Sequence, residues 1–167
     1  MPAAVTVRPA IATDRRDVRE AIVELQEHER ALHPTRLPGE RIADAYWDWL
    51  WLRLEAADGA MLVAESDGAF VGFIVGWIET VEVVTETPDS NRSGYVSDLF
   101  VLPAFRGRGV ATLLLKAIET RLRRADIRII RLSALAANVS ARSCYEKSWF
   151  APYEVVYEKA LEPRRPE

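Results

Sequence analysis

Apolar residues follow two different periods along this chain, and the two periods alternate. Spacings of three and four residues, typical of amphipathic helices, run from Thr13–Asp14 onward and over 40–54, 110–123 and 140–147. Alternating or continuous apolar runs, typical of strands, lie at 5–8, 61–65, 70–78, 95–102, 128–135 and 155–161. The predicted order is strand, two helices, three strands, helix, strand, helix and strand, which indicates an α/β domain.

The run 70–78 predicts a central strand. Val71, Phe73, Val75 and Trp77 share one face by alternation, and the residues between them are also small or apolar. Both faces are therefore expected to be buried under helices. We expect one domain over 1–161, and a flexible tail over the charged, proline-bearing residues 162–167.

The overall composition narrows the class of protein. The chain has 167 residues with a formal net charge of −3, so it offers no net basic field for nucleic acid. One Cys excludes an internal disulfide and fits a reducing compartment, and two His with one Cys predict no metal site. No signal pattern or membrane-length apolar run is present, so we expect a cytoplasmic protein without a membrane partner.

The segment 98–111 carries the clearest chemistry. It predicts a strand, a short turn and a helix that starts behind Gly107 and Gly109, with Arg106 and Arg108 beside them. Free amides at a helix N-terminus, glycines that allow close approach and two guanidinium groups predict a phosphate site. It is not a P-loop, because G-x-x-x-x-G-K-[ST] is absent, and Thr112 stands where a dinucleotide fingerprint has its third glycine.

Arg106, Gly109 and Ala111 match [RQ]-x-x-G-x-[GA], so the segment resembles the acetyl-CoA pyrophosphate loop of the GCN5-related N-acetyltransferases. The predicted order of elements over 5–161 is similar to that of this family. The resemblance implies an α/β (α+β) fold with a mixed sheet and helices on both faces, acetyl-CoA as co-substrate, and no metal. It also implies a strand ending at Val101 that diverges from the 128–135 strand, admits pantetheine and supplies an oxyanion donor. The implied CoA contacts are Leu99, Phe100, Val101, Arg106, Gly107, Arg108, Gly109, Val110, Ala111, Asn138, Arg142 and Tyr145.

A second segment, 138–150, resembles the family's N-x-x-[AS]-x-x-x-[YF]-x-x-x-G-[FA]. Asn138, Ala141, Tyr145 and Phe150 match, but Trp149 replaces the glycine. An indole takes a left-handed cap less readily, so the end of this helix, and the effect of the indole on the acceptor side, stay open.

Motif position makes Tyr145 the candidate acid for the departing thiolate; its alternative role is packing. Motif position does not select one residue as the base that takes the proton of the acceptor amine. The strand 95–101 is similar to that of polyamine (diamine) acetyltransferases, in which an acidic residue stands at the position of Ser97. A water held by Ser97 or the Tyr95 hydroxyl could take the proton, as could a carboxylate of Glu79, Glu82 or Asp98. Strict alternation predicts that Ser97 and Asp98 face opposite sides. Cys144 is expected to be a small core residue.

Acidic side chains cluster on the segments that wall the acceptor side in the family. They either attract a cationic amine or merely keep the surface soluble: Glu24, Glu27, Glu29, Glu40, Asp44, Asp48, Glu79, Glu82, Glu86 and Asp89. We expect Trp49 to pack inward and Trp47 or Trp51 to line the cleft or a homodimer interface. The leading hypothesis is an acetyl-CoA-dependent N-acetyltransferase for a small-molecule or peptide amine. The alternative is an acyl-CoA-binding sensor on the same fold without turnover.

Overall fold

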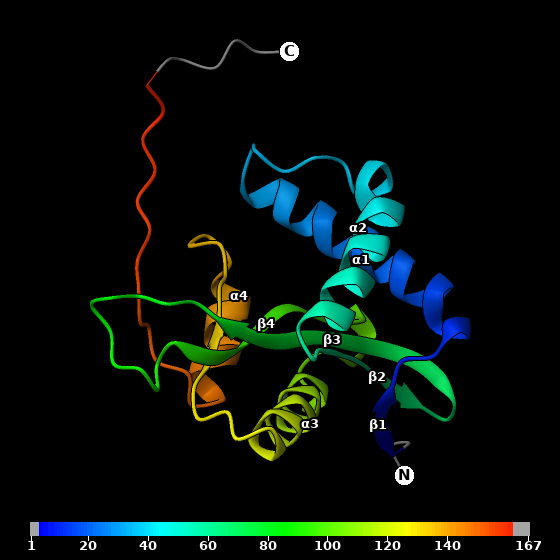
Figure 1. Cartoon of the computed structure of the whole chain (residues 1–167). Coiled ribbons are helices and arrows are strands. Elements are labelled where there is room, and N and C mark those ends of the chain that lie inside the picture. The colour runs from blue at the N-terminus through cyan, green and yellow to red at the C-terminus, as the bar shows by residue number, and fades with distance from the viewer. Residues whose placement is uncertain (1–3, 162–167) are drawn as a thin grey trace.

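The computed structural model describes residues 4–161, which form a five-stranded sheet with helices on both faces (Figure 1). The strands are β1 (Val5–Pro9), β2 (Ala60–Ser66), β3 (Ala69–Thr80), β4 (Arg92–Val101) and β5 (Ile130–Leu132). The helices are α1 (Arg15–Leu32), α2 (Gly39–Ala56), α3 (Val110–Arg124) and α4 (Val139–Lys147). The α/β fold class predicted from the sequence is confirmed. Within residues 4–161, none of the helices combines the length and apolar composition that a membrane span requires.

The sheet is mixed, and its last strand, β5, is joined to the other four by a short pairing. Strands β1 to β4 are antiparallel neighbours in sequence order, and β5 runs parallel to β4. The β4–β5 pairing covers only Gly94–Ile130, Tyr95–Arg131 and Val96–Leu132, whereas β4 stays paired with β3 as far as Val101. Residues 97–101 of β4 therefore present an edge that β5 does not cover, as the resemblance implied.

Two apolar layers cover the sheet. Phe73, Val75 and Trp77 of β3 pack with residues of α1 and α2. Ile74 and Val71 pack with α3 on the opposite face. The prediction that Val71 shares a face with Phe73 is wrong, because an irregularity opposite Ala64 and Glu65 shifts the register of β3. Such bulges invert the faces of the residues beyond them.

Two predicted strands differ from the structure. The 128–135 strand is reduced to β5, three residues long. The 155–161 strand is not formed: residues 151–160 have no secondary structure and run away from the sheet (Figure 1, red). A strand needs a neighbour for its backbone groups, and within the described residues this segment has none. The predicted tail, 162–167, lies outside the described residues.

Candidate active site

The predicted phosphate loop leads into α3. Gly107 and Gly109 have φ of +72° and +82°, and a Cβ at either position would meet nothing within 4 Å. The left-handed backbone, not crowding, is therefore what favours glycine here. The first helical bond is donated by the Leu113 amide to the Gly109 carbonyl at 3.0 Å. The amides of Val110, Ala111 and Thr112 precede this bond, so they are available to an anion.

Both loop arginines are held beside this helix start. Arg106 donates from Nε to the Val101 carbonyl at 2.9 Å, and its guanidinium lies over the Phe100 ring. Arg108 lies over the ring of Phe105, 5.4 Å from the centroid. The Arg106 contact joins the end of β4 to the loop while leaving its Nη groups as donors. Two exposed positive charges thus accompany the free amides.

Hydrogen bonds near the end of β4 show in which direction its backbone N–H groups point. The Leu102 amide donates to Val71 of β3, whereas the Val101 carbonyl accepts from Arg106 on the other side. Because backbone groups alternate along a strand, the N–H groups of Val101 and Leu99 point toward the uncovered edge. Either amide can meet an oxyanion placed between the diverging strands.

A bulge in β4 reshapes the site. Val75 pairs with Asp98 and Gly76 with Val96, so Ser97 is the extra residue. The predicted separation of Ser97 and Asp98 onto opposite faces is wrong, because a bulge breaks the alternation. The Ser97 hydroxyl instead donates to Asp98 Oδ2 at 2.6 Å.

Asp98 is a buried carboxylate held by two hydroxyls. The Asp98 side chain accepts a hydrogen bond from the Ser97 hydroxyl and another from the hydroxyl of Tyr46 of α2. The Tyr46 hydroxyl lies 2.9 Å from Asp98 Oδ2 and 3.1 Å from Oδ1. Burial raises the pKa of Asp98 to about 6, against the lowering effect of the two hydrogen bonds, and the charge of Glu29 raises it further. Burial and the neighbouring Asp98 raise the pKa of Tyr46, which stays a donor. The result is a buried carboxylate that is ionised near neutral pH and could accept a proton.

Tyr145 of α4 is exposed to the charges of Asp98 and Glu29, and Glu29 also acts on Asp98. Its ring packs edge-on against Phe150, with centroids 6.1 Å apart. Burial raises the pKa of Tyr145 to about 12, with smaller contributions from Cys144, Asp98 and Glu29. The phenol is therefore protonated at neutral pH. Burial also raises the pKa of the Cys144 thiol, which disfavours the nucleophilic thiolate.

The remaining residues of the second motif shape α4. The Asn138 side chain caps the helix by accepting from the Ala141 amide at 3.1 Å, and Arg142 donates to the Ala136 carbonyl. Trp149 takes the left-handed cap with φ of +68°, and the Phe150 amide closes the turn on the Tyr145 carbonyl. Trp149 is 96% exposed, so its indole does not fill the acceptor side.

Aromatic rings surround the Tyr46 position. Trp49 stacks on Tyr46 and meets Trp77 edge-on, and Trp77 contacts Tyr95. The prediction that Trp47 or Trp51 lines a cleft is wrong for Trp47, which is buried with Leu50 and Leu54 in the stripe of α2 that faces the core. Trp51 packs edge-on against Trp47. Trp49 packs on Tyr46 and Trp77, as expected, but is 43% exposed.

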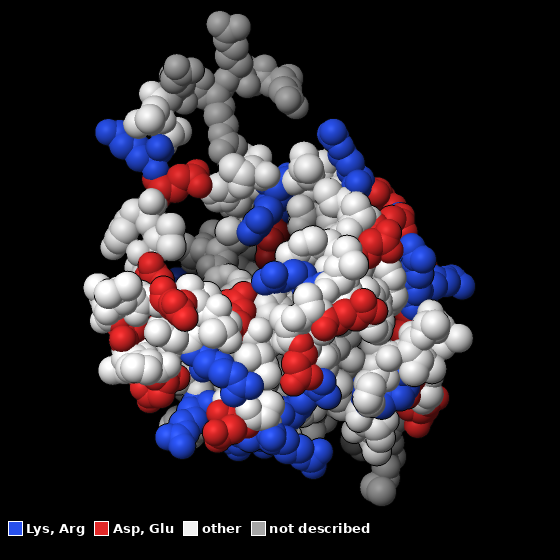
Figure 2. All heavy atoms as spheres, viewed as in Figure 1, with Lys and Arg blue, Asp and Glu red and all other residues white. Residues whose placement is uncertain are grey.

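The acidic residues of α1 and α2 are largely paired. Arg19 contacts Glu40 and Asp44, and Arg15 lies near Asp44 and Asp48. Figure 2 shows charges of both signs interspersed on the visible face, with no broad acidic field. Steering of a cation by these surface carboxylates is accordingly weakened. Glu29 pairs with Arg36 at 3.0 Å, and its charge still raises the pKa values of Asp98, Tyr46 and Tyr145.

The chain is similar to proteins of one family over most of its length. A model of the acetyltransferase (GNAT) family matches residues 21–149. The chain belongs to this family. An uncharacterized N-acetyltransferase of Archaeoglobus fulgidus is 33% identical over 79% of this chain and 85% of its own length. A second one, from Methanocaldococcus jannaschii, is 34% identical over 67% of this chain, which spans about half of that relative, 47% of its length.

Two further proteins are similar to this chain. A thialysine N-epsilon-acetyltransferase of Mus musculus is 26% identical, covering 86% of this chain and 82% of that protein. The structure of a predicted acetyltransferase from Clostridium acetobutylicum with acetyl-CoA superposes with a TM-score of 0.69 and 20% identity, covering 95% of this chain and 97% of that one. At that identity the likeness shows the fold.

In this GNAT domain, the structure brings some predicted residues together and not others. Ser97 and Asp98 meet, and the CoA candidates 99–101 and 106–111 follow one another along β4 and into α3. Glu79 instead accepts from the Trp77 indole and lies near Arg53.

Within the described residues, no group of three His, Cys, Asp or Glu could hold a metal. A groove beside Arg121 and Arg124 lies at the opposite end of α3 from the loop.

Sequence reasoning missed Tyr46 as a partner of Asp98. Tyr46 belongs to an apolar stripe of its helix, and nothing in its spacing separates it from a packing residue. The electrostatic effect of Glu29 on Asp98 and Tyr145 was also hidden among ten acidic candidates. Only the packing of α1 and α2 on β4 selects these two.

Proposed function

We propose that this GNAT domain moves an acetyl group from acetyl-CoA to the primary amine of a small molecule by direct attack in a ternary complex. The observation that carries the proposal is the Asp98 carboxylate, buried at the β4 bulge and bound by Ser97 and Tyr46. A carboxyl with a pKa of about 6 is suited to accept a proton from an amine near neutral pH.

The donor would lie along the open edge of β4. The pyrophosphate would meet the amides at the start of α3, with Arg106 and Arg108 beside it, and pantetheine would follow residues 97–101. The carbonyl oxygen would receive an amide of Leu99 or Val101. The structure of the Clostridium acetobutylicum relative with acetyl-CoA supports this choice of donor. Among the motif residues, Asn138 and Arg142 would act mainly by shaping α4.

The proton transfers can be written through this chain's own groups. The ammonium form of the acceptor gives one proton to the Ser97 oxygen as the Ser97 hydroxyl proton passes to Asp98, which frees the nitrogen lone pair to attack the thioester carbon. The nitrogen of the tetrahedral intermediate loses a second proton to solvent. The intermediate then collapses with cleavage of the carbon–sulfur bond, Tyr145 donates a proton to the departing thiolate, and the resulting tyrosinate is reprotonated from solvent. The raised pKa of Cys144 argues against an acyl-enzyme on that thiol.

For the acceptor we propose a small cationic amine. The thialysine acetyltransferase relative supports a small molecule, and the Glu29 charge near the catalytic groups favours a cation. A cytoplasmic location accompanies this proposal because the one Cys fits a reducing compartment.

The test is thiol release from acetyl-CoA with a panel of diamines, amino acids, aminoglycosides and peptides. We expect release with at least one small amine, and its loss in Asp98→Asn and Ser97→Ala. Tight CoA binding without turnover on any amine would instead support the acyl-CoA sensor. Turnover on peptides alone would contradict the proposed small-molecule acceptor and would leave the proposed acetyl transfer from acetyl-CoA to an amine unaffected.

A further inference from the structure

Arg53 of α2 carries a guanidinium that the protein itself does not fully bond. Its Nη2 lies 3.7 Å from Glu79 Oε1, which is beyond hydrogen-bond distance, and that oxygen is bound instead by the Trp77 indole at 3.1 Å. Arg53 Nε is buried and has no hydrogen-bond partner within residues 4–161. Buried donors are normally paired, so a group that lacks partners in the protein is a candidate for binding a ligand.

Two indoles hold this guanidinium in place. Arg53 Cζ lies 5.2 Å from the centroid of the Trp77 ring and 5.8 Å from the centroid of the Trp49 ring. Cation–π contacts position a guanidinium through its charge and use none of its N–H groups. The Arg53 side chain is 43% exposed, so donors remain for a planar anion such as a carboxylate that comes from solvent.

A continuous row of side chains connects Arg53 to the proposed base. Tyr46, which donates to Asp98, stacks on Trp49 with ring centroids 5.5 Å apart. Trp49 meets Trp77 edge-on, and both indoles contact Arg53. Residues 46, 49 and 53 share one face of α2, because they follow one another at spacings of three and four. The guanidinium therefore stands about two helical turns, or about 10 Å along the helix, from the place where the acceptor would lose its proton.

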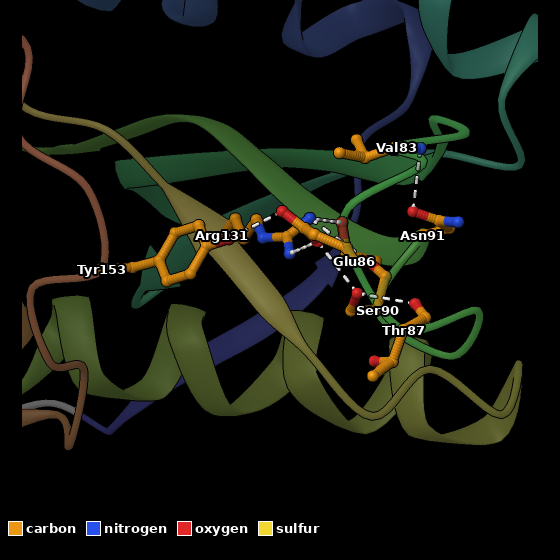
Figure 3. Close-up of polar contacts among 8 residues, drawn as sticks. Val83, Glu86, Thr87, Ser90, Asn91, Arg131 and Tyr153 are labelled. Atoms are coloured by element: carbon orange, nitrogen blue, oxygen red, sulfur yellow. Dashed lines mark hydrogen bonds and ion pairs between the residues drawn. The ribbon is translucent and has the colours of Figure 1, made fainter.

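Arg131 of β5 shows the contrast. It pairs with Tyr95, whose ring contacts Trp77, so it belongs to the same end of the sheet. Its guanidinium donates to Glu86 at 3.1 Å and lies over the ring of Tyr153, which also donates to Glu86 (Figure 3). Protein groups of the loop 81–91 and of the last described residues therefore occupy Arg131, whereas Arg53 keeps donors for a ligand.

We propose that Arg53 binds a carboxylate of the acceptor, so that the acceptor is an amino acid whose reacting amine lies at Asp98. The inference rests on the proposed function and narrows it, from small cationic amines in general to those that also carry a carboxylate. The carboxylate would accept two parallel hydrogen bonds from the guanidinium. The span between Asp98 and Arg53 places the two recognised groups at opposite ends of the molecule, as in an amino acid with an amine at the end of its side chain.

Charge separates this acceptor class from diamines. Glu29 acts on Asp98 and favours a cation at the reacting end, whereas Arg53 places a cation at the other end. A diamine would bring its second ammonium group toward Arg53, and like charges at short range repel each other. A carboxylate in that position is attracted instead, which gives selectivity as well as affinity.

The experiment compares amino acids with the diamines that lack only their carboxylate: lysine with cadaverine, and ornithine with putrescine. Thiol release from acetyl-CoA measures kcat and KM for the unmodified chain and for Arg53→Gln. We expect Arg53→Gln to raise KM for the amino acids by ~10-fold or more, with kcat and both diamines little affected. Arg53→Lys keeps the charge and should restore part of the loss. Arg41→Gln, at an exposed position of the same helix, is the matched control, and circular dichroism checks that each variant is folded.

Calorimetry on the CoA-bound protein tests the same contact without turnover. We expect at least one of the two amino acids to bind more tightly than its diamine, and this advantage to be lost in Arg53→Gln. An equal effect of Arg53→Gln on amino acids and diamines, a preference of the unmodified chain for the diamines, or no binding of either amino acid would overturn the proposal and leave acetyl transfer to other amines standing. Arg53-dependent binding of an amino acid without acetylation of any amine would instead overturn the proposed function and keep the carboxylate contact.

Discussion

The hydroxyl of Tyr46 lies 2.9 Å from the carboxylate of Asp98, although 52 positions separate the two residues. This bond joins α2, which lies on the side proposed for the acceptor, to the bulge of β4. It also opposes the effect of burial on the pKa of Asp98. The acceptor-side helix therefore helps to set the pH at which the proposed base is ionised.

Removing this hydroxyl is expected to shift the pH profile. In Tyr46→Phe the carboxylate loses a donor, so the pKa of Asp98 rises above about 6 and more of the base is protonated at neutral pH. The acidic limb of kcat/KM should move to higher pH, with activity recovering as the pH is raised. Tyr95→Phe, which removes a hydroxyl bonded to Ser133 and not to Asp98, should leave that limb in place. A pH-independent loss in Tyr46→Phe would indicate a purely structural role.

Asp98 is expected to cost stability in return for its reactivity. Its pKa is raised from 3.8 to about 6, so the folded state holds its proton more tightly than the unfolded state. The carboxyl is neutral in both states below about pH 3, and its ionisation destabilises the fold progressively above about pH 4, reaching about 3 kcal/mol above pH 6. Asp98→Asn should therefore raise the free energy of unfolding at pH 8, with the gain vanishing near pH 3, and should abolish turnover. Denaturant titrations at both pH values measure this; equal effects at the two would refute it.

Local patterns in the sequence account for much of this fold. Helix α3 and its loop are predicted because the apolar stripe, the two glycines and the arginines are neighbours in the chain. The contacts of Asp98 could not be predicted in this way. The bulge at Ser97 depends on the register between β3 and β4, and Tyr46 reaches Asp98 only through packing of α2 on the sheet. The 155–161 strand shows the same limit, because propensity identifies a strand without supplying its neighbour.

Glu29 is expected to act on acceptor affinity. Its charge raises the pKa of Asp98, so Glu29→Gln should lower that pKa slightly while weakening attraction of a cationic amine. We expect a higher KM for the amine with a smaller change in kcat, and a weaker dependence of KM on salt. Glu24→Gln, on an exposed position of the same helix, is the matched control. An unchanged KM with a lower kcat would instead place Glu29 with the chemical step.

Charge at the start of α3 is expected to control CoA affinity. Reversal at Arg106 with Arg108 removes two cationic donors and adds two negative charges beside the free amides, which should weaken CoA binding by ~10²-fold or more. The same reversal at Arg124, the last residue of α3, with Arg128, which follows that end of the helix, is the control and should have little effect. Calorimetry with CoA measures both. Equal affinities in the two double variants would show that the pyrophosphate does not bind at this loop.

Tyr145 is expected to act on turnover and not on binding. Tyr145→Phe keeps the ring that packs against Phe150 and removes only the hydroxyl, which in the described structure bonds to no protein group. Loss of a positioned acid typically costs ~10²-fold or more, so kcat should fall by that order while CoA affinity stays close to that of the unmodified chain. The loss should be smaller with a thioester whose thiol has a lower pKa, because a better leaving group needs less protonation. If Tyr145→Phe slowed all thioesters equally, or did not slow them, the phenol would not be the proton donor.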